Sequence, residues 1–319
     1  MENLMFSLNS TMPLFFIMVL GYWLFKKTFL TEAVITAANK FVYHITLPIM
    51  LFHDLAVTDF TTGFDVRFVG FCAVSTITSI LIIWLLCHLT VKDKQIFGEF
   101  VQACYRSSAA ILGTAFIQNI YGNSGMSGLM ILGSVPLYNI FAVLILTLEA
   151  PKGKNNEVSI WPLLKDSIKK MLQNPTLISI ALGFAASLMN IPIPVMLSKA
   201  MSSIGAMTSP LALLAIGAGF KGKAALGKIR PTIAAALIKL IVLPGIFLPI
   251  AVRVGILDQQ LVALLVMLGS ITTPSAYIMA KQLGHEGILT GSVCAVTTVF
   301  SSITLTIWLF WAKSNGYII

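Results

Sequence analysis

Apolar runs long enough to cross a lipid bilayer recur along this chain and restrict it to one class of protein. A membrane-spanning helix needs about 20 mostly apolar residues. The chain is 57% hydrophobic and only 10% charged, whereas soluble domains carry about 25% charged residues. We therefore predict an all-α polytopic membrane protein, in which the net charge of +9 does not indicate nucleic-acid binding. The ten predicted spans are residues 8–26, 33–53, 66–90, 97–121, 126–149, 175–191, 192–220, 231–254, 258–283 and 287–312.

The basic residues are divided unevenly between the loops on the two sides of the predicted membrane. With the N-terminus outside, the cytoplasmic loops hold 14 of the 21 Lys and Arg residues. The outer loops hold only Arg67, Arg253 and Lys313. Because Lys and Arg are enriched in cytoplasmic loops, both termini are predicted to lie outside the cytoplasm.

Glycine, proline and serine residues recur at one fixed offset of 162 positions. Each half then contains five spans, and because five is odd the second half must enter the membrane from the opposite side. We predict two inverted five-helix repeats, residues 1–149 and 175–319, joined by a cytoplasmic linker at 150–174 that carries an interfacial amphipathic helix. Inverted repeats are typical of secondary transporters. The matching pairs are Pro13 and Pro175, Gly21 and Gly183, Pro48 and Pro210, Ser108 and Ser270, Gly122 and Gly284, and Gly125 and Gly287.

A charged residue, Arg106, lies near the middle of the fourth span. It is about 13 Å along a helix from Phe97, close to the middle of a hydrocarbon layer about 30 Å thick. A charge at this depth is costly unless it faces protein or water, so Arg106 is a candidate substrate contact together with Ser107 and Ser108. No Asp or Glu lies near a span centre, and a guanidinium suits a carboxylate ligand. A structural arginine bonded to helix carbonyls is the alternative.

The repeat pairs this stretch with the middle of the ninth span, which combines a proline with several hydroxyl groups. Pro274 lacks an N–H and interrupts a helix. The freed backbone groups can then be satisfied by ligands, ions or nearby hydroxyls. We expect spans four and nine to be broken and to cross near the midplane, and an ordinary proline kink is the alternative. The site candidates here are Ser270, Thr272, Thr273, Pro274 and Ser275.

Each of the other polar residues within the spans has two possible roles. Tyr138 and Asn139, in the fifth span, either contact the substrate or hydrogen-bond between helices. His44, in the second span, either carries a proton or packs as a hydrogen-bonded histidine.

Three lysines also fall in the interior of predicted spans, away from the span ends. Long lysine side chains can reach the surface from inside a span, and this is the preferred interpretation of Lys40, Lys199 and Lys239. Lys40 and Lys199, together with His44, are kept as candidates for coupling or gating. We predict no metal site and no cofactor, and both H⁺ and Na⁺ stay open as coupling ions.

Four motifs follow one another in the order and spacing of a known family. They are LPIMLF at 47–52, YRSSAAILGTAFIQNIYG at 105–122, Asn174-Pro175, and ITTPSAYIMAKQLG at 271–284. With them the whole chain resembles the auxin efflux carrier family. The resemblance implies broken helices four and nine that cross around the substrate, an elevator-like motion and a homodimer. Family members move organic anions, but they commonly have Asn or Pro where this chain has Arg106-Ser107-Ser108, so the substrate is not carried over.

These observations predict a secondary active transporter of a small organic anion, a mono- or dicarboxylate, that works by alternating access. The resemblance and the short central loop predict a bacterial cytoplasmic membrane. The expected partners are the anion, membrane lipid and a second copy of the chain, and no nucleic acid. An anion channel or a receptor with a transporter fold is the alternative. A membrane enzyme is disfavoured, because the sequence contains no paired intramembrane aspartates and no recognisable catalytic motif.

Overall fold

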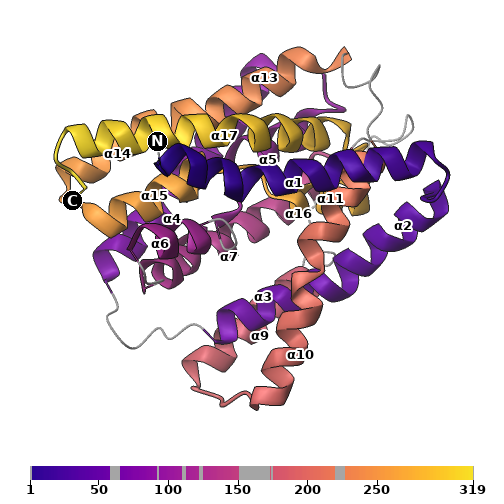
Figure 1. Ribbon diagram of the computed structural model, residues 1–319, viewed down its shortest axis with the longest axis horizontal. Helices are drawn as coiled ribbons and strands as arrows, with labels where there is room; N and C mark the ends of the chain where they lie inside the picture. The colour runs from indigo at the N-terminus through magenta and orange to yellow at the C-terminus, as the bar shows by residue number, and fades with distance from the viewer. Residues whose placement is uncertain are drawn as a thin grey trace, which may run out of the picture.

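The computed structural model describes residues 2–57, 65–91, 93–109, 113–121, 125–150, 173, 175–219 and 227–318. Regular structure in these residues is helical (Figure 1), and one isolated antiparallel bridge joins two extended segments. The predicted amphipathic helix of the linker lies outside the described residues. The helices are α1 (Glu2–Lys26), α2 (Glu32–Phe41), α3 (Leu47–Ala56), α4 (Val66–Thr90), α5 (Phe97–Tyr105), α6 (Thr114–Tyr121), α7 (Gly125–Leu148), α9 (Pro175–Leu188), α10 (Val195–Ala206), α11 (Thr208–Ala218), α13 (Ile229–Leu237), α14 (Leu243–Arg253), α15 (Asp258–Gly269), α16 (Pro274–Gln282) and α17 (Ile288–Ser314).

Helices long and apolar enough to cross a membrane are present, as the sequence predicts. Within the described part of the chain, six segments meet this description. Several are joined from two consecutive helices, and shorter apolar helices accompany them. The prediction of an all-helical membrane protein is confirmed at this level. The six segments are Glu32–Ala56, Val66–Thr90, Met126–Leu148, Val195–Ala218, Ile229–Arg253 and Ile288–Ser314.

Two of these segments contain a widened turn of π-helix. The turn η1 (Val42–Thr46) joins α2 to α3, and η3 (Ile238–Val242) joins α13 to α14. A proline follows each turn near the start of the next helix, Pro48 and Pro244 respectively. Because proline has no N–H and its ring crowds the preceding turn, the regular i→i+4 pattern is disturbed there. These turns change the direction in which the following side chains point.

The fourth and ninth predicted spans are each interrupted in the middle. Helix α5 ends before Arg106, whose backbone is extended with φ −77° and ψ 107°. Helix α15 ends before Ser270, which is also extended with φ −79° and ψ 177°. Pro274 then starts α16 within its first turn, a position where its missing N–H costs nothing. The structure thus contains a helix break in both spans.

Two glycines bring helices from the two halves of the chain into backbone contact. A Cβ placed on Gly21 of α1 would overlap the carbonyl of Leu214 in α11. A Cβ on Gly183 of α9 would come within 2.7 Å of the carbonyl oxygen of Phe52 in α3. Gly183 lies 162 residues after Gly21, and Leu214 lies 162 residues after Phe52. The two contacts are therefore equivalent at the offset of the sequence repeat.

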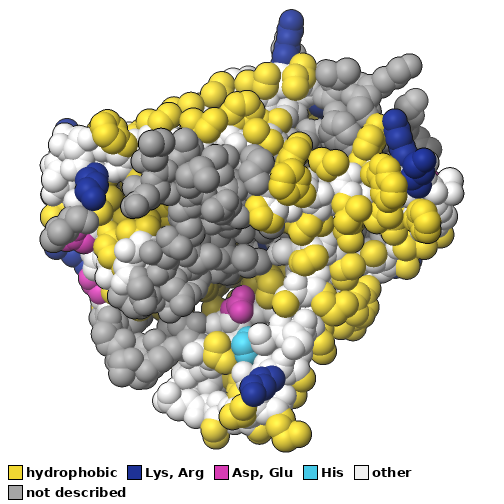
Figure 2. Space-filling model, in the orientation of Figure 1, with side chains coloured by type: hydrophobic (Ala, Val, Ile, Leu, Met, Phe, Trp, Pro, Cys, Tyr) yellow, Lys and Arg dark blue, Asp and Glu magenta, His cyan; other side chains and the backbone are white. Residues whose placement is uncertain are grey.

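The helices form two groups in Figure 1. Helices α3, α9 and α10 lie together at the bottom of the view, whereas α13, α14 and α17 lie along the top. Helix α1 packs against both α11 and α17, and both chain ends lie towards the left. Figure 2 shows hydrophobic side chains over much of the described surface. Phe16 and Phe310, for example, are 64% and 74% exposed, as expected for a surface that faces lipid.

Candidate functional site

The two interrupted spans meet through their extended segments. Ser107 and Thr272 form an antiparallel bridge. On one side of it the Ser108 N–H donates to the Ile271 carbonyl at 3.0 Å, and on the other the Thr273 N–H donates to the Arg106 carbonyl at 3.4 Å. Buried backbone groups outside helices need such partners. We call residues 106–109 and 270–273 the crossover.

Side chains satisfy other backbone groups that the helix breaks leave open. The last carbonyls of a helix have no partner within it. At the end of α5 the Thr272 hydroxyl donates to the Ala103 carbonyl at 3.0 Å. The Thr272 N–H in turn donates to the Thr297 hydroxyl of α17 at 3.0 Å. Thr272 therefore holds the crossover to α5 and α17, and it does not line the crossover pocket described below.

Arg106 is buried in the crossover, with 2% of its surface exposed. Its Nη2 donates to Oδ1 of Asn139 at 2.6 Å and to Oγ of Ser275 at 3.3 Å. Its Nη1 contacts the sulfur of Met279 at 2.8 Å. A thioether is a weak hydrogen-bond acceptor. The described partners of the guanidinium are therefore all uncharged, and one of them is weak.

Helix α7 presents the two residues of the fifth span that the sequence singles out. The Asn139 Nδ2 donates to the Val135 carbonyl at 2.8 Å, which turns Oδ1 towards Arg106. The Tyr138 hydroxyl donates to the Met267 carbonyl of α15 at 3.0 Å. Tyr138 thus makes an interhelical hydrogen bond, Asn139 bonds the crossover at Arg106, and both residues border the pocket described next.

A small pocket of about 40 Å³ lies against the crossover. One water molecule needs about 10–15 Å³ on such a measure, and ligand pockets run to several hundred. The pocket therefore has room for a few water molecules and not for an organic anion. Its lining residues are Leu47, Met50, Leu51, Arg106, Ser107, Ser108, Ala109, Val135, Tyr138, Asn139, Thr273 and Ser275.

The structure thus brings together seven of the sequence candidates in this lining, Arg106, Ser107, Ser108, Tyr138, Asn139, Thr273 and Ser275. Pro274 is buried beside them at the start of α16. Ser270 is fully buried but does not line the pocket. Its hydroxyl has no hydrogen-bond partner among the described residues.

The remaining candidates lie on the exposed surface of the described chain. Lys40, His44 and Lys199 are all exposed, and none of them borders the crossover pocket. The His44 ring nitrogen Nδ1 hydrogen-bonds to the Lys40 carbonyl at 3.0 Å, one turn earlier in the same span. The exposure of Lys40 and Lys199 agrees with side chains that reach the surface.

The prediction that the Lys239 side chain reaches the surface is wrong. The sequence favours a side chain that extends to the surface, but Lys239 is 0% exposed, and its Nζ donates to Oγ of Ser107 at 2.7 Å and to the Tyr105 carbonyl at 3.3 Å. The widened turn η3 contains Lys239 and packs against α5. The sequence feature that could have identified Lys239 is its position near the middle of Ile229–Arg253. Arg106 is recognised by a similar central position in its own span.

Glu99 is a second buried charge that the sequence interpretation does not assign to a site. It is 0% exposed in α5. Its carboxylate accepts the N–H groups of Gly287 and Thr290, both at 2.9 Å, and the Thr290 hydroxyl at 3.0 Å. These donors belong to the first turn of α17, where the helix dipole favours a negative charge. Glu99 therefore attaches α5 to the start of α17.

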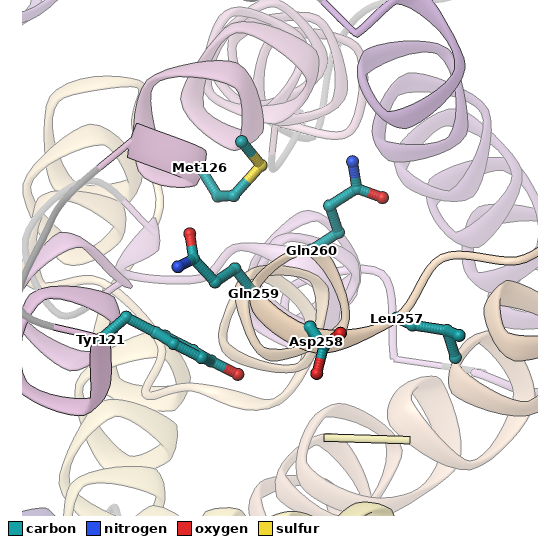
Figure 3. A pocket seen from close by; sticks show the side chains of 6 residues that line it. All are labelled: Tyr121, Met126, Leu257, Asp258, Gln259 and Gln260. Carbon is teal, nitrogen blue, oxygen red and sulfur yellow. The ribbon is translucent and has the colours of Figure 1, made fainter. Parts of the chain in front are cut away.

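A larger pocket of about 470 Å³ opens elsewhere, between the end of α6, the beginning of α7 and the beginning of α15. Figure 3 shows its six lining side chains, among them Tyr121, Asp258 and Gln259. None of the sequence candidates lines it. Its size suits a small molecule, but it lies apart from Arg106.

The chain was compared with known proteins and protein families. A family model described as "Membrane transport protein" matches residues 6–309, nearly the whole chain. A comparison with curated proteins gave no match. The match agrees with the resemblance that the motifs at 47–52, 105–122 and 271–284 indicate. The chain belongs to the membrane transport protein family, the family of the auxin efflux carriers.

Proposed function

We propose that this protein is a secondary active transporter of a small organic anion, a mono- or dicarboxylate, across a bacterial cytoplasmic membrane. The observation that carries the proposal is the environment of Arg106. Its guanidinium is buried beside a pocket and has only uncharged partners among the described residues. A carboxylate that replaced Met279 and Asn139 as acceptor would gain two charge-assisted hydrogen bonds.

Neighbouring donors support an anion at the same position. The hydroxyls of Ser275 and Thr273 lie 3.2 Å apart on the pocket wall. Thr273 is the N-cap of α16 and Ser275 lies in its first turn, where the helix N-terminus favours negative charge. Arg106 from one half of the chain and the start of α16 from the other would then bind the anion together.

The small volume of the pocket supports a mechanism in which its walls move. Leu47, Met50 and Leu51 of α3 form one wall, and the crossover forms the other. We propose that the crossover with α5, α7, α15 and α16 slides past α3 and its neighbours α9 and α10, in an elevator-like form of alternating access. Such a movement would open the pocket to one side of the membrane and then to the other.

We also propose that the chain forms ten membrane spans arranged as two inverted repeats, residues 1–149 and 175–319, with both termini outside and a homodimer as the functional unit. The glycine contacts support the repeat. Gly21 packs against Leu214 and Gly183 packs against Phe52, and these two contacts are equivalent at the offset of 162. At the offset of 162, the helix breaks before Arg106 and Ser270 lie within two residues of each other in the fourth and ninth spans. The distribution of basic residues supports the orientation.

Transport in proteoliposomes tests the proposal. The probes are malonate and succinate as dicarboxylates and lactate as a monocarboxylate. One of them should show saturable counterflow, and Arg106→Gln should weaken it about 10- to 100-fold, the loss expected for a hydrogen bond to a charged group. Lys313→Gln, which changes an exposed lysine in the last turn of α17, is the matched control. Unchanged affinity in Arg106→Gln contradicts the site, and current without counterflow indicates a channel.

A further inference from the structure

The side chain of Lys239 is a second cation at the crossover. Its partners, Ser107 and Tyr105, are not among the residues that the Arg106 guanidinium contacts. Its Nζ donates to Oγ of Ser107 at 2.7 Å and to the Tyr105 carbonyl at 3.3 Å. Both acceptors are neutral oxygens, and Lys239 does not line the pocket that Arg106 borders. A fully buried ammonium is costly unless its surroundings need a positive charge.

The C-terminal end of α5 is a place where a positive charge is favourable. Tyr105 is the last residue of the helix, so its carbonyl belongs to the group that has no partner within the helix. The C-terminal end of a helix carries a partial negative charge. In transporters with broken helices, carbonyls of this kind and nearby hydroxyls are where a coupling cation is coordinated. Lys239 Nζ lies against one carbonyl and one hydroxyl of this type.

We propose that the ammonium of Lys239 takes the place of a coupling Na⁺ at the crossover, so that the protein carries its own cation and needs no sodium. The inference rests on the proposed transport function. The turn η3 makes the substitution feasible, because it brings a lysine from the middle of α13–α14 against the end of α5.

Ser107 connects this cation to the anion pocket. Its Oγ accepts from Lys239, and the same residue lines the pocket beside Arg106. With the oxygen engaged by the ammonium, the hydroxyl hydrogen is directed to the pocket side, where Tyr138 is its partner in this structure. The fixed cation therefore orients a donor for the anion, as a bound Na⁺ would.

Thermal unfolding of the purified protein with NaCl, KCl or choline chloride at equal concentration tests the inference. The wild-type protein should show no Na⁺-specific rise in Tm. Lys239→Ala and Lys239→Ser should each lower the Tm, because the carbonyl of Tyr105 loses its partner. Both should gain a Na⁺-specific rise of a few degrees, because Na⁺ can then bind the vacated oxygens. Lys313→Ala, at an exposed lysine in the last turn of α17, should behave as the wild type.

A Na⁺-specific rise in the wild type overturns the inference, and this measurement does not depend on the folding of any variant. A folded Lys239→Ala or Lys239→Ser protein without a Na⁺-specific rise also overturns it. A parallel malonate titration of Arg106→Gln separates the two proposals. If that variant keeps the malonate response of the wild type, the anion site is wrong, whereas the sodium measurements still decide the role of Lys239.

Discussion

The hydroxyl of Thr208 donates to the hydroxyl of Thr46 at 2.9 Å, between two residues 162 positions apart. Thr46 ends the turn η1 and Thr208 starts α11, and both are buried, 0% and 1% exposed. In the proposed inverted repeat, two equivalent residues that bond each other lie close to the axis relating the two halves. This contact therefore supports the proposed repeat.

Replacing Thr208 with the isosteric Val should destabilise the protein by about 1 kcal/mol, the net value of a buried hydrogen bond. Thr46→Val should have a similar effect. Because the two hydroxyls share one bond, the double variant should lose less than the sum of the single variants. Thermal unfolding in detergent provides the measurement, with Thr90→Val at an exposed position as the control. Strictly additive effects would show that the two hydroxyls act independently.

The glycine contacts predict two matched losses of stability. Gly183→Ala should destabilise by about 1–3 kcal/mol, because a Cβ would lie 2.7 Å from the Phe52 carbonyl oxygen, and overpacking of this kind costs about that much. Gly21→Ala should behave alike against Leu214. Gly70→Ala is the control, since a Cβ there meets nothing within 4 Å. It should leave the Tm unchanged or raise it, and a comparable fall at Gly70 would contradict the packing argument.

Removal of the Glu99 carboxylate should loosen the attachment of α17. Glu99→Ala leaves the N–H groups of Gly287 and Thr290 without their acceptor, and hydrogen bonds to a charged group contribute about 1.5–3 kcal/mol. We expect a lower Tm and faster amide hydrogen exchange confined to the first turn of α17. Glu286→Gln removes an exposed partner of Lys228 and should cost at most about 1 kcal/mol. Equal effects of the two substitutions would argue against the special role of Glu99.

Asp65, the residue that caps α4, should make stability depend on acid pH. The Phe68 N–H donates to its carboxylate at 3.0 Å, and this bond, with a smaller contribution from Gln260, lowers the pKa of Asp65 below its ordinary value of 3.8. Because the folded-state pKa is the lower one, the stabilisation is complete above the ordinary value and is lost as the pH falls through the lowered value. The Tm of Asp65→Asn should therefore fall less than that of the wild type over this acid range. Parallel curves would contradict the assignment.

The sequence allows the helix break of the ninth span to be predicted with a physical reason, and that of the fourth span only by analogy. Pro274 interrupts the ninth span locally. No proline lies near Arg106. The extended segment after α5 depends on the hydrogen bonds that Ser108 donates to Ile271 and that Arg106 accepts from Thr273, and these partners are far away in the chain. Local residue patterns carry no information about such distant partners. The repeat offset is what transfers the expectation from one half to the other.

The same distinction applies to the site. Arg106 is recognisable because a charge in the middle of an apolar span is costly and is rarely found there without a functional role. Lys239 has the same depth, but a lysine side chain is long enough to reach the surface, so its sequence position does not decide its direction. The turn η3 and the oxygens of Tyr105 and Ser107 decide it. These depend on the packing of α13 against α5, which only the structure provides.

The partners of Arg106 become available at different times during synthesis of the chain. Asn139 follows it by 33 residues, but Ser275 and Met279 follow by 169 and 173. When the first five spans have left the ribosome, the guanidinium therefore still lacks the partners that the ninth span supplies. Until that span is made, Asn139 is the one of these three partners that the first half can supply. The surroundings of Arg106 are then completed only after the second half has been inserted, so the proposed site forms late in biogenesis.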